Sequence, residues 1–312
     1  MPSPKKPNAL RPGARIRIIS PASPAPSDRI HRGMGALIQL GYQPEPQTER
    51  CDSIGYFSSS QSSRFAELSN ALNAKDVAAV IASRGGYGSS YLLAELAKEK
   101  SPQPKIFCGF SDTTVISCLL WKKWRWVSFY GPMVAAGFDS GADAPGGFEC
   151  DSFTRATTQV RGGWKLALNG EPLCEGHASG ILLGGCLTLL QTSIGTPWEL
   201  DTRGAILAIE DRGVRPYQVD RMLMHLLQAG KLRGVRGIVL GDFPDCDPLN
   251  NEGPTVPEVC SRILGALKIP VVWGAPVGHT KRAMLTLPFG VCAKLTARGG
   301  GTLEILEPAV KS

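Results

Sequence analysis

The first half of the chain alternates short apolar runs with segments of helical periodicity, and this pattern limits the fold more than any other feature. The run VAAVIA at 77–82 has no polar position, as is typical of a strand buried on both faces. Segment 62–74 instead spaces its apolar residues at a helical period. Further strands are predicted at 14–20 and 105–110, and further helices at 28–42 and 113–123. This alternation predicts a parallel sheet covered by helices.

The alternation stops in the middle of the chain and then resumes. Residues 134 to about 172 are rich in Gly, Asp and Ala and have weak periodicity, which predicts a linker or a long crossover. Strand and helix patterns return in the second half, and the tail from 282 to 306 is strand-like. We therefore predict a two-domain α/β protein, with an N-terminal domain at 1–146, a linker or crossover at 147–172 and a C-terminal domain at 173–312.

Composition argues against several function classes. No apolar run approaches the roughly 18 residues that would span a bilayer, and the apolar segment behind Lys5 and Lys6 is too short for a signal peptide. The nine cysteines are scattered, without a CxxC pair or the spacing of a metal site, so we expect free thiols, a cytoplasmic protein and no bound metal. The net charge of +7 is spread along the chain, which favours small anionic substrates over nucleic acid.

Ser111 stands between the predicted strand at 105–110 and the predicted helix at 113–123. It could be an N-cap of the helix. It could instead be a nucleophile on a sharp strand-to-helix turn, close to backbone N–H groups that stabilise an oxyanion. The local sequence is G-F-S-D-T, and Thr113 stands where the G-x-S-x-G elbow of α/β-hydrolases has its second Gly. An esterase of that class is therefore disfavoured, and a non-catalytic ligand-binding protein is a further alternative.

A serine nucleophile needs a base, and the chain has four histidines. His31 and His225 lie in helical patterns, and His177 lies in the loop-like stretch EGHASG. His279 directly follows the predicted strand PVVWG and so falls at the carboxyl edge of a sheet, where open α/β folds assemble their sites. His279 is therefore the favoured base, with His177 as the alternative.

An acid that orients the base would complete a triad. Glu210 and Asp211 end the predicted strand at 205–211, and Asp242 ends another at 237–242. Each of these carboxylates could equally cap a helix or form an ion pair. The residue pattern alone leaves the acid open among the three.

The glycine-rich segment SRGGYGSS at 83–90 follows the strand VAAVIA and opens a helix. Turns of this kind direct backbone N–H groups at an anion, yet the spacing matches neither of the glycine motifs that bind nucleotides. Three glycines within four residues indicate close approach by a ligand. Arg84 beside them could hold a carboxylate.

Seven parts of the chain form an ordered set: PGARIRIISPASP, SRGGYGSSYLL, CGFSDTT, GPM at 131–133, LLGGCLTLLQTSIGTPW, AILAIED with YQVDRML, and GHTKRAMLTLPFG. They extend from about residue 10 to about residue 300. In this order they resemble the LD-carboxypeptidase family of serine peptidases, the muramoyltetrapeptide carboxypeptidases. The resemblance implies a flavodoxin-like N-terminal domain, a strand-rich mixed α/β C-terminal domain, and a homodimer.

The resemblance also implies an active site between the two domains. The implied catalytic triad is Ser111, Glu210 and His279. The implied oxyanion hole consists of the backbone N–H groups of Gly86 and Asp112. We add Arg84 and Tyr87 as candidate substrate contacts, and no cofactor is expected.

The implied reaction is hydrolysis of the L,D-peptide bond between the terminal D-Ala and the diamino acid of cytoplasmic murein tetrapeptides, a step of peptidoglycan recycling. The rival within the family is the microcin C self-immunity type, which cleaves an amide in a peptidyl-nucleotide toxin with the same triad. Aromatic residues that stack on a nucleobase would separate the two, and the candidates are Trp198 and Trp273. One position departs from the family pattern: Cys186 replaces the Asn of a GGN motif, which bears on substrate preference.

Overall fold

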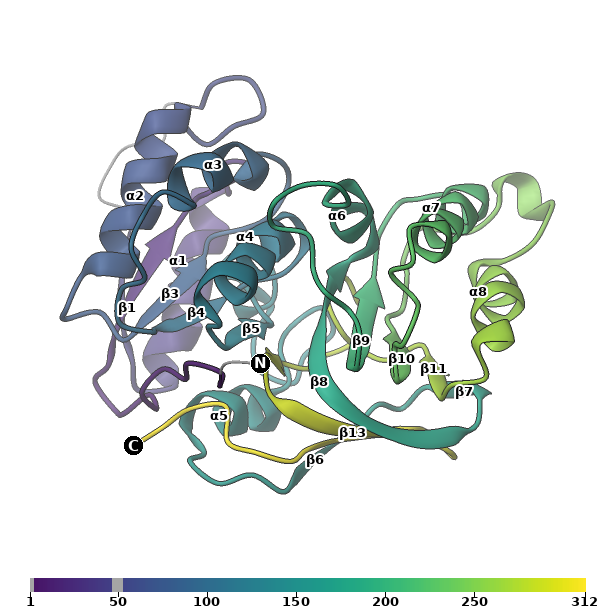
Figure 1. Ribbon diagram of the computed structural model, residues 1–312. Helices are drawn as coiled ribbons and strands as arrows, with labels where there is room; N and C mark the ends of the chain where they lie inside the picture. The colour runs from purple at the N-terminus through teal and green to yellow at the C-terminus, as the bar shows by residue number, and fades with distance from the viewer. Residues whose placement is uncertain (1–2, 47–52) are drawn as a thin grey trace.

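Two β-sheets form within residues 3–46 and 53–312, the part of the chain that the computed structural model describes (Figure 1). The first sheet has the strand order β2-β1-β3-β4-β5-β12, in which β1 to β5 are parallel. This 2-1-3-4-5 order is flavodoxin-like and confirms the fold predicted for the first half. Its strands are β1 (Arg15–Ile19), β2 (Gln43–Glu45), β3 (Ala79–Ala82), β4 (Ile106–Cys108), β5 (Ser128–Tyr130) and β12 (Leu287–Phe289).

Both faces of the first sheet are buried, because successive residues of each strand pack into opposite apolar layers. Ile18 packs in one layer with Leu37 of a helix on that face. Ile19 packs in the other layer with Leu68. This double coverage explains the uninterrupted apolar runs of the sequence. The helices are α1 (Ser27–Gln39) on the first face, and α2 (Gln61–Asn73), α3 (Leu93–Leu96) and α4 (Thr114–Leu119) on the second.

The second sheet has the order β6-β14-β13-β8-β9-β10-β11-β7. Strands β8 to β11 are parallel, whereas the strands on either side of them pair antiparallel. This confirms the predicted mixed α/β character of the second half. The strands are β6 (Trp164–Ala167), β7 (Glu171–Cys174), β8 (Gly176–Cys186), β9 (Ala205–Glu210), β10 (Gly237–Leu240), β11 (Val271–Trp273), β13 (Cys292–Ala297) and β14 (Thr302–Ile305). The helices α6 (Leu187–Thr192), α7 (Pro216–Gln228) and α8 (Val256–Leu264) cover one face.

The two sheets share chain segments and a core. Strand β12 comes from the last part of the sequence, yet it pairs antiparallel with β5 at the edge of the first sheet. Residues 147–172, for which the sequence predicts a linker or crossover, hold helix α5 (Cys150–Thr158) and strand β6, an edge of the second sheet. One apolar cluster includes Phe129 of β5 and Leu287 of β12 from the first sheet and Leu182 of β8 from the second. The region between the sheets is therefore fixed by packing from both halves of the chain.

Short helical turns complete the described chain. A π-helical turn extends α4, so that the two together account for the helix predicted at 113–123. The described helices all fall short of the length and apolarity that a bilayer crossing requires. The described cysteines are free thiols and most are buried, as expected. The turns are Ser89–Leu92, Ser111–Thr113, Phe138–Ser140, Leu249–Asn251 and Gly265–Leu267, and the π-helical turn is Leu120–Trp124.

Candidate active site

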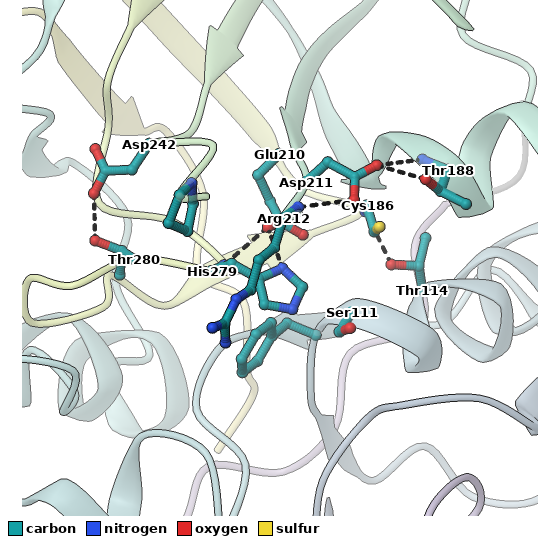
Figure 2. Close-up of polar contacts among 12 residues, drawn as sticks. Ser111, Thr114, Cys186, Thr188, Glu210, Asp211, Arg212, Asp242, His279 and Thr280 are labelled. Carbon is teal, nitrogen blue, oxygen red and sulfur yellow. Dashed lines mark hydrogen bonds and ion pairs between the residues drawn. The ribbon is translucent and has the colours of Figure 1, made fainter. Parts of the chain in front are cut away.

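The carboxyl ends of parallel strands from both sheets meet where the triad is predicted (Figure 2). Ser111 follows β4 of the first sheet, whereas Glu210 ends β9 and His279 follows β11 of the second. Such sheet edges collect the loops that bind ligands in open α/β folds. Three residues that lie far apart in the sequence are thus brought to one place.

Ser111 occupies a strained turn. Its φ of 61° lies in the left-handed region, which costs a non-glycine residue about 1–2 kcal/mol and is concentrated at functional sites. Phe110 stands at the N-cap position of the helical turn, without a side-chain capping bond, so the capping role considered for Ser111 is wrong. The buried Asp112 carboxylate accepts a hydrogen bond from the Ser89 N–H at 2.8 Å. This bond ties the serine turn to the glycine-rich segment.

Glu210 and His279 form a buried acid–base pair. Glu210 Oε2 accepts hydrogen bonds from the His279 backbone N–H at 2.8 Å and from Nδ1 at 2.7 Å. Because a carboxylate only accepts, Nδ1 carries a proton and Nε2 is left to act as a base. Burial alone would raise the pKa of Glu210, but the charge and hydrogen bonds of His279, together with the hydrogen bond from Tyr130, outweigh burial and lower the pKa. Burial would lower the pKa of His279, yet Glu210 outweighs burial and raises it.

Ser111 and His279 line one cavity of about 270 Å³, and Figure 2 shows the serine next to the imidazole. The ring of Phe110 packs edge-on against the imidazole, with centroids 5.0 Å apart, and so limits its tilt. The hydrogen bonds found among the described side chains include none between Ser111 and His279. Catalytic hydrogen bonds of this kind often tighten only when substrate binds.

The glycine-rich turn packs directly over the serine. A Cβ on Gly85 would lie 3.1 Å from Ser111 Oγ, and a Cβ on Gly86 would lie 2.3 Å from Ser23 Oγ. Gly86 also has a φ of 104°, which side chains rarely allow. Its N–H has no backbone acceptor within the described chain, and the Asp112 N–H lies in the first turn of a helical segment, where such groups lack helical partners. Both N–H groups are therefore available to an oxyanion.

Four of the described cavity-lining residues are cations, namely Arg29, Arg84, Arg212 and Lys281. Arg212 and Lys281 both contact Asp245. Arg84 donates to the carbonyl of Pro24 at 3.2 Å, and none of the carboxylates in the described chain pairs with it. Arg29 pairs with Asp139, so Arg84 is the one of these four cations that has no carboxylate partner in the described chain. Sequence reasoning did not propose the other three, because Arg29 comes from helix α1 and Arg212 and Lys281 from two separate loops that are far apart in the sequence.

The two other carboxylates considered as triad acids, Asp211 and Asp242, bond to residues other than His279. Asp211 accepts hydrogen bonds from the Thr188 N–H at 2.8 Å and its hydroxyl at 2.7 Å. Asp242 forms an ion pair with Arg282 at 2.5 Å. Within the described chain, Glu210 alone among the three bonds His279, which favours Glu210 among the alternatives that the sequence leaves open.

Tyr130, which sequence reasoning missed, contacts both halves of the site. It ends β5, and its buried hydroxyl donates to Glu210 Oε1 at 2.5 Å. The same hydroxyl accepts a hydrogen bond from the Ser111 N–H at 3.2 Å. The only local signal in the sequence is its position at the end of a short apolar run, directly before the GPM segment.

Cys186, where the family pattern has Asn, lies behind Glu210 and not in the cavity lining. It is the cross-strand neighbour of Glu210 in the β8–β9 pair. Its backbone N–H donates to Thr114 Oγ1 at 3.0 Å (Figure 2), and burial raises the pKa of its thiol. The departure from the family pattern therefore lies next to the acid and outside the cavity lining.

The aromatic candidates lie outside the cavity lining. Tyr87 is 47% exposed and packs against the ring of Tyr91. Trp273 stacks on Phe243, and Trp198 packs against an apolar layer of the first sheet. None of these three side chains lines the cavity that contains Ser111, as the structure describes it.

The remaining histidines are not among the described residues that line the cavity. His31 and His225 lie on helices α1 and α7, as predicted. His177 is part of β8 and pairs with Thr296, so its predicted loop position is wrong. His279 therefore stands as the histidine of this site.

Comparisons with known proteins agree with this geometry. Residues 16–131 match the model of the LD-carboxypeptidase N-terminal domain, and residues 179–295 match that of the LD-carboxypeptidase C-terminal domain. The chain belongs to the LD-carboxypeptidase family. Membership makes it a serine-type carboxypeptidase.

Individual relatives cover nearly the whole chain. A Bacillus subtilis protein named "Probable murein peptide carboxypeptidase" is 32% identical over an alignment of 315 positions, which covers 98% of this chain and 97% of that protein. The solved structure of muramoyltetrapeptide carboxypeptidase from Oxalobacter formigenes is 34% identical, with a TM-score of 0.81 over 95% of this chain and 99% of that one. The microcin C7 self immunity protein MccF is 24% identical, with a TM-score of 0.85 over 99% and 100%, and shows the shared fold alone.

Proposed function

We propose that this LD-carboxypeptidase removes the terminal D-Ala from murein tetrapeptides, with Ser111 as its nucleophile. The observation that carries the proposal is the Glu210–His279 pair beside a strained serine, in a cavity lined by cations. The names of the relatives from Bacillus subtilis and Oxalobacter formigenes support the substrate class. We further propose a role in peptidoglycan recycling, a cytoplasmic location and a homodimer, as the family resemblance implies.

In the proposed mechanism, His279 Nε2 takes the proton of Ser111 Oγ as this oxygen attacks the peptide carbonyl carbon. The C–N bond then breaks, and His279 returns the proton to the amine of the departing D-Ala. A water molecule, deprotonated by the same imidazole, then attacks the acyl carbon, and the imidazolium returns this proton to Ser111 Oγ as the ester bond breaks. Glu210 keeps the other proton on Nδ1 and stabilises the imidazolium.

The oxyanion of each tetrahedral intermediate would be bound by the N–H groups of Gly86 and Asp112. Their availability supports this role, because neither is needed by the turns in which they lie. Loss of one such donor typically costs about 2.7–4 kcal/mol of transition-state stabilisation. The strain at Ser111 is consistent with a backbone held for this geometry.

A carboxypeptidase must also hold the free carboxylate of the residue that it removes. Arg84 is our candidate, since it lines the cavity and pairs with none of the described carboxylates. The excess of positive charge around the cavity would attract an anionic muropeptide. Contact between Tyr87 and substrate stays a prediction, and its exposed position at the end of the glycine-rich turn suits a more distant part of a long substrate.

The peptidyl-nucleotide alternative needs an aromatic surface for the base. Trp198 and Trp273 are not among the described residues that line the cavity, in which Phe110 is the aromatic residue beside His279. Phe110 already packs against the imidazole. This lining favours a peptide substrate over a nucleotide.

The test compares purified wild-type protein with Ser111→Ala on two substrates, murein tetrapeptide and a peptidyl-adenylate. We expect the wild type to release D-Ala from the tetrapeptide and Ser111→Ala to release almost none. Turnover of the peptidyl-adenylate without any D-Ala release would replace this proposal with the rival. A Ser111→Ala variant that keeps most of the wild-type rate would reject the proposed nucleophile.

A further inference from the structure

The side chain of Tyr130 bridges the two sheets next to the proposed catalytic groups. Its hydroxyl accepts a hydrogen bond from the backbone N–H of Ser111, in the first sheet, at 3.2 Å. It donates to Oε1 of Glu210, in the second sheet, at 2.5 Å. We propose that Tyr130 is a positioning residue that holds the nucleophile turn and the triad acid in register across the two sheets. This inference rests on the proposed triad.

The ring of Tyr130 is fixed from both halves of the chain. Phe289 of β12 stacks on it with centroids 5.1 Å apart and an interplanar angle of 20°. Phe110, next to the serine, contacts it edge-on at 6.3 Å. Leu287 is its direct cross-strand neighbour in the β5–β12 pair. With the ring held on these sides and 1% exposed, the hydroxyl has a fixed position and can set the distance between the groups that it joins.

The two oxygens of the Glu210 carboxylate have different hydrogen-bond partners. Oε2 receives both bonds from His279, and Oε1 receives the bond from Tyr130. Burying a carboxylate with one oxygen unpaired costs free energy. The bond from Tyr130 pairs Oε1, so Glu210 can stay ionised without a further hydrogen bond from the imidazole. On the other side, the bond to the Ser111 N–H helps to hold the backbone in its left-handed conformation.

The test variant is Tyr130→Phe, which keeps the ring and removes both hydrogen bonds. We expect kcat for D-Ala release to fall about 10- to 100-fold, since the bond to the charged Glu210 carboxylate and the bond from the Ser111 N–H are both lost, while KM changes less than about threefold. The acid limb of kcat/KM should move to higher pH, because a carboxylate without the tyrosine bond attracts the imidazolium more strongly. The ionisable or charged groups near this pair are Cys186, Asp211 and Arg212, and the variant leaves them in place.

Tyr42→Phe is the matched control. Tyr42 is also buried in the core of the first half but lies outside the cavity lining, so its variant should keep the wild-type kcat and pH profile. Phe289→Leu is the second variant. It keeps the hydroxyl but loosens the ring stack, and it should lower kcat in the same direction by a smaller factor.

The outcomes separate this inference from the proposed function. A wild type that releases no D-Ala would refute the proposed function itself. An active wild type, with Tyr130→Phe equal to it in kcat and in pH profile, would overturn the positioning role alone. If Tyr130→Phe does not fold, Phe289→Leu decides, and its unchanged kcat and pH profile would overturn the role equally.

Discussion

Replacing Gly86 by Ala tests the proposed oxyanion hole most closely. The new Cβ would lie 2.3 Å from Ser23 Oγ and 2.6 Å from Ser23 Cβ, so the turn that carries the Gly86 N–H must move. Moving one of two oxyanion donors out of reach should lower kcat by about 10²–10³, or about 2.7–4 kcal/mol. KM should change little, because the donor acts on charge that develops in the transition state.

The assay is steady-state D-Ala release, with folding checked by thermal unfolding. Gly41→Ala is the matched control, because Gly41 has a φ of 86° but open space around its Cα. Both variants carry the left-handed strain of a non-glycine residue, about 1–2 kcal/mol, so both should have a lower Tm. The loss of kcat should occur in Gly86→Ala alone. A folded Gly86→Ala that keeps kcat within about twofold of wild type would refute the oxyanion role.

Three further predictions follow from the site. Glu210→Gln should lower kcat by about 10⁴. It should also move the acid limb of kcat/KM to lower pH, because the carboxylate that raises the pKa of His279 is gone. An acid limb at the wild-type pH would contradict the Glu210–His279 pairing. Arg84→Ala should raise KM for the tetrapeptide about 10-fold or more and leave KM for an analogue with a C-terminal amide unchanged; equal effects on both would exclude a carboxylate contact. Asp112→Ala should lower the free energy of unfolding by about 1–3 kcal/mol, measured in denaturant, because the buried Ser89 N–H loses its acceptor; an unchanged midpoint would contradict it.

Much of the fold could be predicted because its signals are local. Strands buried on both faces must be apolar throughout, as VAAVIA is, and helices must present an apolar face to them. The carboxyl ends of such strands face the same way, so Ser111 and His279 could be assigned to sheet edges before any contact was known. The family resemblance then selected Glu210 from three carboxylates at strand ends, a choice that the geometry supports.

The rest depends on contacts between distant segments. Strand β12 joins the first sheet although it comes from the last part of the chain. The apolar pattern of a strand predicts that the strand forms but does not indicate which strand it pairs with. The role proposed for Tyr130 depends on its hydrogen bonds to both Ser111 and Glu210, two residues that lie 99 positions apart in the sequence. The weak periodicity of 147–172 hid the helix α5 and the strand β6, whose burial depends on neighbours elsewhere in the chain.

The most direct test of the central claim is to identify the residue that becomes covalently modified. A fluorophosphonate, which reacts with an activated serine, is added to the wild type and to Ser111→Ala, and peptide mass spectrometry locates the adduct. We expect the adduct on Ser111 in the wild type, no adduct at the site in Ser111→Ala, and much slower labelling in His279→Ala, since the hydroxyl is a weak nucleophile without its base. Labelling of another residue, or an undiminished rate in His279→Ala, would contradict the account of Ser111 as a nucleophile activated by the Glu210–His279 pair.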